Sequence, residues 1–245
     1  MNPLTFPARA LGWASIGLVT VVAGLLLLPA TRESMKSLLD EGHVVEWLTF
    51  ATLLLAGFGA VGLTAGRQRW WVKIFYLIFG LLLIITAAEE VAWGQQIFGF
   101  ETPSFLRAIN RQGEATLHNI GGLQERSEYF RIIFGLGGLA GVLLRRSKSF
   151  AELATPPNLA PLFVVIVVVT GFDQMADIYP VPQDVDAGLQ ALSELIEMLV
   201  GVAALLYVLA KRSYYKTSST PVAPTIPPST GSTTPVNHRA ESEQR

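Results

Sequence analysis

The sequence predicts an all-α integral membrane protein, a bundle of about six transmembrane helices, and two observations carry that prediction. Hydrophobic residues make up 51% of the 245 positions and charged residues only 15%. Ordinary soluble domains contain roughly a quarter charged residues. The apolar residues also gather in runs of about twenty, the length that an α-helix needs to cross the hydrocarbon core of a bilayer. Lipid is therefore the expected surrounding of most of the chain.

Six apolar segments are candidates for spans. They are residues 11–30, 44–65, 72–92, 129–144, 160–178 and 187–210. The first segment is longer than the apolar region of a secretory signal peptide, so we expect it to be retained as a helix. The fourth is short and rich in glycine, which suits close packing against a neighbouring helix.

The distribution of Lys and Arg predicts the orientation of the spans. One set of connections carries Arg9, Arg67, Arg69, Lys73, Arg145, Arg146, Lys148, Lys211, Arg212 and Lys216, and the other carries Arg32, Lys36, Arg107, Arg111, Arg126 and Arg131. The positive-inside rule then places both termini in the cytoplasm. The long connection between the third and fourth spans would lie on the extracytoplasmic side.

Composition also predicts the extent of the transmembrane domain and excludes some classes of partner. Residues 1–212 would form the transmembrane domain, and residues 213–245, rich in Thr, Ser and Pro, predict a disordered cytoplasmic tail. The net charge of -1 leaves no basic stripe for phosphates, so nucleic acid is excluded as a partner. The chain has no cysteine, which excludes disulfides and thiolate metal ligands.

Acidic residues stand inside or at the ends of the predicted spans. They are Glu46 at the start of the second, Glu89 and Glu90 at the end of the third, Asp173 and Asp177 at the end of the fifth, and Glu194 and Glu197 in the sixth. A charged side chain at the membrane centre costs about 2.5–3.5 kcal/mol on insertion scales, so such residues are usually paired and functional. Because the helices alternate in direction, all of these acids fall in the outer half, where we expect them to converge.

The connection of residues 98–128 adds further polar candidates. It is too long for a plain turn, which makes it a candidate for function. It contains Asn110, Gln112, Glu114, His118 and Asn119. Glu114 and His118 are four residues apart, so a short helix would present them together.

A motif spans the end of the third segment and this connection. It runs Glu90-Val-Ala-Trp93-Gly94-Gln95-Gln-Ile-Phe98-Gly99, then Thr102-Pro103, Asn110-x-Gln112-Gly113-Glu114 and Leu117-His118-Asn119. Over about thirty residues it resembles a family of uncharacterised bacterial multi-pass membrane proteins, whose members more often have Ser at position 92 and Arg at position 96. The resemblance implies placement in a bacterial cytoplasmic (inner) membrane, and it implies no reaction.

One hypothesis from these residues is a metal-dependent hydrolase acting on a lipid-like ester or amide. A divalent metal would be held by His118, Glu90 and Glu46, and Glu90, His118 and Glu114 would be the catalytic groups. A polar ligand or lipid headgroup would contact the remaining candidates, which are Glu89, Trp93, Gln95, Asn110, Gln112, Asn119, Asp173, Asp177, Glu194 and Glu197.

Two other hypotheses stay open beside it. The acids could line a path for protons, cations or a polar solute, because close, buried carboxylates are suited to a proton relay. Alternatively the acids are structural and pair with Arg107, Arg111, Arg126 or Arg131. The sequence leaves undecided whether the protein is an enzyme. It indicates the lipid bilayer as a partner and does not identify any protein partner.

Overall fold

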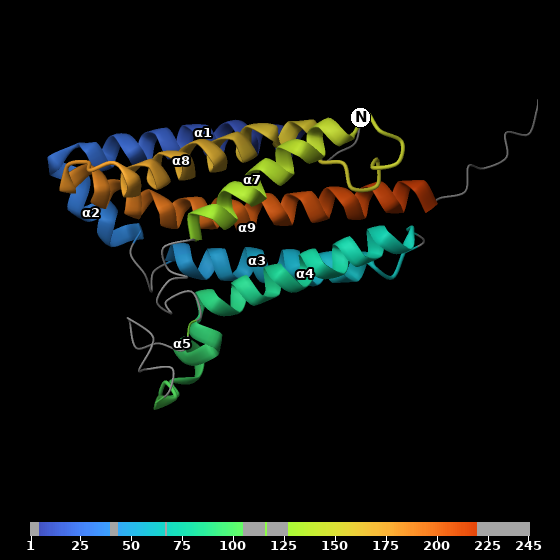
Figure 1. Ribbon diagram of the computed structural model, residues 1–245, viewed down its shortest axis with the longest axis horizontal. Coiled ribbons are helices and arrows are strands. Elements are labelled where there is room, and N and C mark those ends of the chain that lie inside the picture. Colours follow the sequence, from blue (N-terminus) through green and yellow to red (C-terminus); the bar gives the residue numbers. More distant parts are fainter. Residues whose placement is uncertain (1–4, 40–43, 67, 105–115, 117–126, 220–245) are drawn as a thin grey trace, which may run out of the picture.

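The structure is a computed structural model that describes residues 5–39, 44–66, 68–104, 116 and 127–219, and no strand occurs among them. Long helices run side by side along the molecule (Figure 1). The helices are α1 (Thr5–Leu27), α2 (Pro29–Leu39), α3 (Val44–Leu63), α4 (Trp70–Glu90), α5 (Gln95–Phe98), α7 (Ser127–Leu144), α8 (Ala160–Ile178) and α9 (Gln183–Ser219), with short 3-10 turns η1 (Ala92–Gly94) and η3 (Pro157–Leu159). The all-α prediction is confirmed.

Four of the helical segments are long and apolar enough to cross a membrane. They are Val44–Leu63, Trp70–Glu90, Pro157–Ile178 and Gln183–Thr217. Helices α1 and α7 fall where the first and fourth spans are predicted. The described apolar part of α1 is shorter, Trp13–Leu27. Helix α7 carries Glu128 and Arg131 near its start.

Helix α9 is the centre of the bundle. Helices α1, α7 and α8 lie on one side of it, and α3 and α4 lie on the other (Figure 1). Half of its apolar window is buried, compared with 28–33% in the other three candidate spans. Its neighbours therefore expose most of their surface outward.

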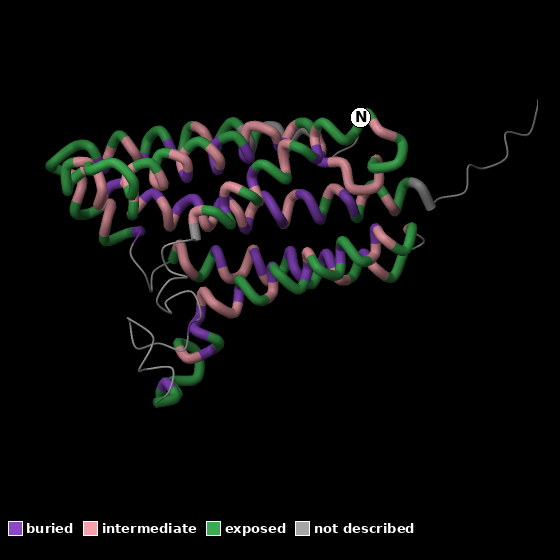
Figure 2. The backbone as a smooth tube through the Cα atoms, viewed as in Figure 1, coloured by how far each residue is buried: buried purple, intermediate pink, exposed green. Residues whose placement is uncertain are grey.

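Large apolar side chains on that outer surface are exposed. Leu55, Phe58, Leu82, Ile133 and Phe172 are each about 60% exposed, on α3, α4, α7 and α8. Figure 2 shows exposed residues along the outward sides of these helices. Soluble monomers rarely expose continuous apolar surface of this extent, so the bundle is suited to lipid rather than water.

Glycines permit the close helix contacts. Gly57 on α3 faces Gly80 on α4 so closely that a Cβ atom on Gly80 would lie 2.8 Å from the carbonyl oxygen of Gly57. On α7, Gly138 packs under the ring of Phe163, and Gly135 packs against Val167, both of α8. Small residues at such crossings let backbones approach, as is typical of membrane helices.

Charge separates along the bundle into two ends. The acidic end, at the left in Figure 1, comprises α2, the starts of α3, α7 and α9, and the ends of α4 and α8. Its described acids are Glu33, Glu46, Glu89, Glu90, Glu128, Asp173, Asp177, Asp184, Asp186, Glu194 and Glu197, against the bases Arg32, Lys36 and Arg131. The basic end holds Arg69, Lys73, Arg145, Arg146, Lys148, Lys211, Arg212 and Lys216, and its described part of the bundle has one acid, Glu152.

Several predicted boundaries are wrong. Residues 213–219 continue α9 as helix instead of beginning a disordered tail, and residues 220–245 lie outside the described part. Helix α1, where the first span is predicted to reach residue 30, ends at Leu27 because Pro29 begins a separate helix, α2, a position that proline favours. The Thr31 hydroxyl and the Arg32 Nε atom donate to the carbonyls of Leu25 and Leu26 at 2.6 and 2.9 Å, which satisfies the end of α1.

Candidate functional site

Arg131 on α7 is the centre of a polar network inside the acidic end. Its side chain is buried, with the residue 6% exposed. Its Nη2 atom lies 2.9 Å from Glu128 Oε1 and 3.7 Å from Asp173 Oδ2, and its Nη1 atom lies 3.5 Å from Glu197 Oε1. Nη1 also donates to the hydroxyl of Ser193. One guanidinium therefore links α7, α8 and α9.

The register of α7 against α8 explains why Arg131 meets Asp173. The helices are antiparallel, and Gly138 packs against Phe163 while Gly135 packs against Ile166 and Val167. One further turn toward the acidic end places Arg131 at the level of Asp173. The glycines bring α7 close enough to α8 for the guanidinium to reach the carboxylate.

Glu90 extends this network to α3 and α4. It is half-buried at the end of α4, and its carboxylate interacts electrostatically with Glu46, Glu194, Glu197 and Arg131. We call Glu46, Glu90, Glu128, Asp173, Glu194 and Glu197 the carboxylate cluster. Arg131 forms ion pairs with Glu128, Asp173 and Glu197 of this cluster.

Glu197 is a deeply placed member of the carboxylate cluster. Glu197 stands fourteen residues after the start of α9 at Gln183 and fourteen before Lys211 at the basic end. At 1.5 Å per residue, it lies roughly 21 Å from the helix start. A position midway between two charged ends is where an unpaired ion is least stable in a bilayer.

Two buried oxygen atoms of α8 lie within one helical turn of Asp173 along the chain. Thr170 Oγ1 and Gln174 Oε1 are buried, and neither has a hydrogen-bond partner in the described part of the chain. Thr170 is 1% exposed and precedes Asp173 by one turn. Both oxygens accept hydrogen bonds, so a proton donor or a cation at this level would find ligands beside the Asp173 carboxylate.

The backbone breaks sharply after Glu90. Ala92, Trp93 and Gly94 take φ values of 46°, 55° and 90°, which is a left-handed conformation that favours glycine. Two non-glycine residues there represent strain of order 1–3 kcal/mol each, of the kind that gathers at functional sites. The break ends α4 at the carboxylate cluster.

Side chains around this break hold neighbouring acids. The Trp93 indole donates to Glu89, and Gln96 Nε2 donates to Glu46 Oε1 at 2.9 Å. Gln95 Nε2 donates to Thr102 Oγ1 at 2.9 Å. Helix α4 does not continue through this break, so Trp93 meets Glu89 across the turn and not along one helix face.

The structure brings five predicted site residues together and separates others. Glu46, Glu90, Asp173, Glu194 and Glu197 belong to the carboxylate cluster. Asp177 is exposed one turn beyond Asp173, Glu89 pairs with Trp93, and Gln95 turns to Thr102. Asn110, Gln112, Glu114, His118 and Asn119 lie outside the described residues.

Sequence reasoning missed Glu128, which binds Arg131 from its own helix, and Ser193, which binds it from α9. Arg131 was counted as a base of the long connection, and as a partner only if the acids were structural. The signal that could have placed it is the spacing of Arg131, Gly135 and Gly138, which form one stripe of a helix. Glu128 and Ser193 then follow as neighbours in space.

A divalent metal site remains a prediction. No group of three or more His, Asp or Glu side chains within the described ranges is arranged to hold a metal ion. The expected ligands Glu46 and Glu90 are described, whereas His118 is not.

Comparison of the chain with protein-family models, curated proteins and solved structures finds no match. The function is therefore inferred from the site alone.

Proposed function

We propose that this protein is a multi-pass protein of the bacterial cytoplasmic membrane that takes up and releases protons at its carboxylate cluster, with cationic solutes competing for the same acids. The observation that carries the proposal is the gathering of acids inside the bundle. Among the described residues, six carboxylates from five helices lie near one another, and three of them form ion pairs with Arg131.

Physical chemistry favours protons as the ions that bind to the carboxylate cluster. Like charges close together in a poorly solvated site disfavour full ionisation, so such carboxylates share protons or bind cations. The described acids are not grouped as a metal cage. Thr170 and Gln174 add neutral oxygens at the same level, which suits a protonated or cationic group.

The topology makes the site accessible from one side. All six spans would cross the membrane with the basic end in the cytoplasm, following the positive-inside rule. The carboxylate cluster would then lie in the outer half. The cytoplasmic half contributes one described acid, Glu152, so a proton would enter and leave from the outer face.

A structural role is the second candidate, and the Arg131 contacts favour it. Three of the six carboxylates approach the guanidinium within 4 Å and tie three helices together. In this alternative the acids stay paired and no proton exchange accompanies function. Glu90 and Glu194 distinguish the two candidates, because Arg131 forms its ion pairs with other acids.

Infrared difference spectroscopy of the reconstituted protein tests the proposal. A pH step should change the C=O stretch of protonated carboxyl groups, and Glu90→Gln or Glu194→Gln should remove part of that signal. Glu33→Gln is the matched control, since its side chain is 85% exposed at the same end. Proton uptake by the reconstituted protein after the pH step, followed with a pH-indicator dye on the outer side, should fall in the first two variants and not in the control.

An unchanged carboxyl signal and unchanged proton uptake in both Glu90→Gln and Glu194→Gln would overturn proton exchange and leave the structural role. A signal shifted by sodium ions or by an added polyamine at constant pH would instead support competition by cations.

A further inference from the structure

Exposed basic side chains surround the end of the bundle opposite the carboxylate cluster. Arg69, Arg145, Arg146, Lys148, Arg212 and Lys216 are exposed there. The nearby described acid, Glu152, is already engaged, because its Oε1 atom lies 3.4 Å from Arg69 Nε. We call these six residues the basic rim. Basic residues therefore outnumber acids at this end within the described part of the chain.

The connection that carries half of the basic rim is fixed to the bundle by buried side chains. The hydroxyls of Tyr76 and Tyr207 donate to the carbonyls of Glu152 and Leu153, each at 2.9 Å. Lys211 Nζ donates to the carbonyl of Ala151 at 3.3 Å. Three consecutive carbonyls are thus held by α4 and α9.

Two more contacts complete this attachment. The Tyr215 hydroxyl donates to the Glu152 carbonyl at 3.2 Å, and the Thr155 amide donates to the Gly141 carbonyl at 3.0 Å. The segment between α7 and α8 is therefore a fixed platform, and Arg145, Arg146 and Lys148 are presented at set positions.

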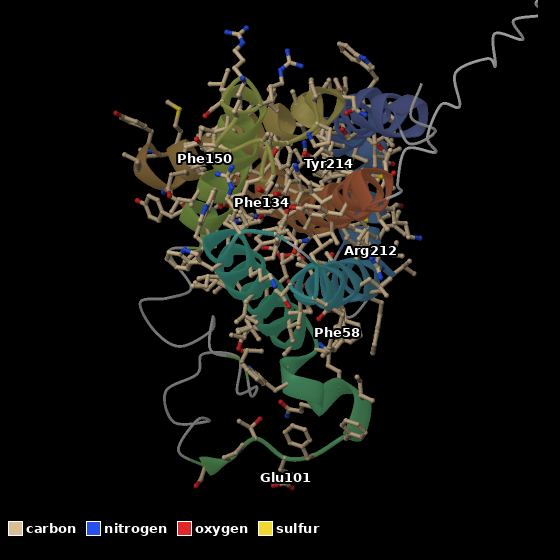
Figure 3. All side chains as sticks on the ribbon, turned by 90° about the vertical axis from the view of Figure 1, so that its right-hand side faces the viewer. Phe58, Glu101, Phe134, Phe150, Arg212 and Tyr214 are labelled. Carbon is tan, nitrogen blue, oxygen red and sulfur yellow. The ribbon has the colours of Figure 1, made fainter. Side chains whose placement is uncertain are left out.

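Aromatic side chains accompany the basic rim. Trp70 is 73% exposed, Tyr214 42% and Phe150 40%. Figure 3 views the molecule from this end and labels Phe150, Arg212 and Tyr214 on it. Aromatic residues of this kind concentrate where a membrane protein meets the headgroup layer.

The length of α9 places the rim at that layer. Its 37 residues span roughly 55 Å, whereas the hydrocarbon core is about 30 Å thick. The turns after Lys211, with Arg212 and Lys216, therefore extend past the apolar part of the bundle.

We propose that the basic rim binds the phosphate headgroups of anionic phospholipids. Headgroup phosphates are the anions nearest to a ring of Arg and Lys that borders apolar spans. Arg offers paired donors that match phosphate oxygens, and its neighbouring aromatic rings contact the acyl region. A soluble acidic protein or nucleic acid would have to approach over the same headgroups. This inference does not depend on proton exchange at the carboxylate cluster.

Native mass spectrometry of the full chain tests it, with phosphatidylglycerol and phosphatidylcholine of identical acyl chains as probes. Wild type should retain the anionic lipid preferentially. The variant Arg145→Gln/Arg146→Gln/Lys148→Gln should bind it at least about tenfold more weakly, since each base near an anionic surface contributes about fivefold. Lys36→Gln at the acidic end is the control and should retain the wild-type preference.

Thermal unfolding in detergent gives a second readout that does not depend on transfer to the gas phase. Phosphatidylglycerol should raise the midpoint of the wild type more than phosphatidylcholine does, and high salt should weaken that difference. Equal retention of the two lipids by the wild type would overturn the proposal. So would a triple variant that keeps the full preference.

Discussion

Arg131 shows how a single residue sets the chemistry of the acidic end. A buried guanidinium is stable only where acceptors meet its donors, and Glu128, Asp173, Glu197 and Ser193 provide them. The same contacts make those carboxylates tolerable inside an apolar bundle. Removal of Arg131 would take away the cation that Glu128, Asp173 and Glu197 share.

We therefore expect Arg131→Gln to destabilise the protein strongly. Removing one partner of a buried ion pair typically costs about 3–5 kcal/mol, because the remaining charge is uncompensated. Unfolding of the purified protein by a denaturing detergent would measure the loss. Arg145→Gln, which alters an exposed arginine, should change the free energy of unfolding by less than about 0.5 kcal/mol.

Neutralising the acidic partners of Arg131 distinguishes two causes of this loss of stability, uncompensated charge and lost packing. If uncompensated charge causes the loss, Arg131→Gln combined with Asp173→Asn and Glu197→Gln should recover much of the stability. A triple variant no more stable than Arg131→Gln would show that the guanidinium acts mainly by filling space.

At the level of the helices, one face of α7 carries glycines that determine how closely α8 packs. A Cβ atom on Gly138 would collide with the Phe163 ring, and one on Gly141 would collide with Thr155. Gly137, the neighbour of Gly138, has no atom within 4 Å of such a Cβ position. Gly137 and Gly138 are therefore a matched pair of adjacent positions, of which only Gly138 faces α8.

Gly138→Ala should weaken the packing of α7 on α8 and lower the unfolding midpoint, with an expected cost of about 1–3 kcal/mol for overpacking. Gly137→Ala should be neutral or slightly stabilising, because alanine is the better helix former. The same detergent unfolding assay compares them. Equal effects of the two substitutions would contradict a seam formed by one face of α7.

The helices themselves were predictable from the sequence because apolar runs of spanning length leave few alternatives. The break at Ala92 and Trp93 was not, since neither residue type favours a positive φ and tertiary contacts impose it. The continuation of α9 through residues 213–219 was missed for a related reason. Polar composition suggested disorder, but Tyr215 bonds to the Glu152 carbonyl and stabilises that turn.

The candidate site was predictable only in part. Alternating helix directions place the acids of different spans at one level, and five predicted residues lie in the carboxylate cluster. Arg131 stands at the edge of an apolar run. A shift of one helical turn in the predicted start of that helix decides whether Arg131 lies in the connection or is buried among the acids. Only the packing of Gly135 against α8 resolves that position.

For the molecule as a whole, the net charge of -1 conceals a strong separation of charge between its two ends. The acidic end carries most of the acids and the basic end most of the described Lys and Arg. A bundle with this asymmetry has one favoured orientation in a membrane, because basic connections are retained in the cytoplasm. The proposed orientation, proton access and lipid contact therefore all rest on the same distribution of charge.

Single-cysteine labelling tests that orientation directly, and the natural absence of cysteine gives a clean background. Ser37→Cys on α2 lies at the acidic end and Ser149→Cys at the basic end, and both positions are exposed. In intact cells a membrane-impermeant maleimide should modify Ser37→Cys at once and Ser149→Cys only after permeabilisation. The opposite pattern would place the carboxylate cluster in the cytoplasmic half, so protons would reach it from inside. Labelling of both sites in intact cells would show that the two ends do not lie on opposite sides of a membrane, which would remove the basis for one-sided access.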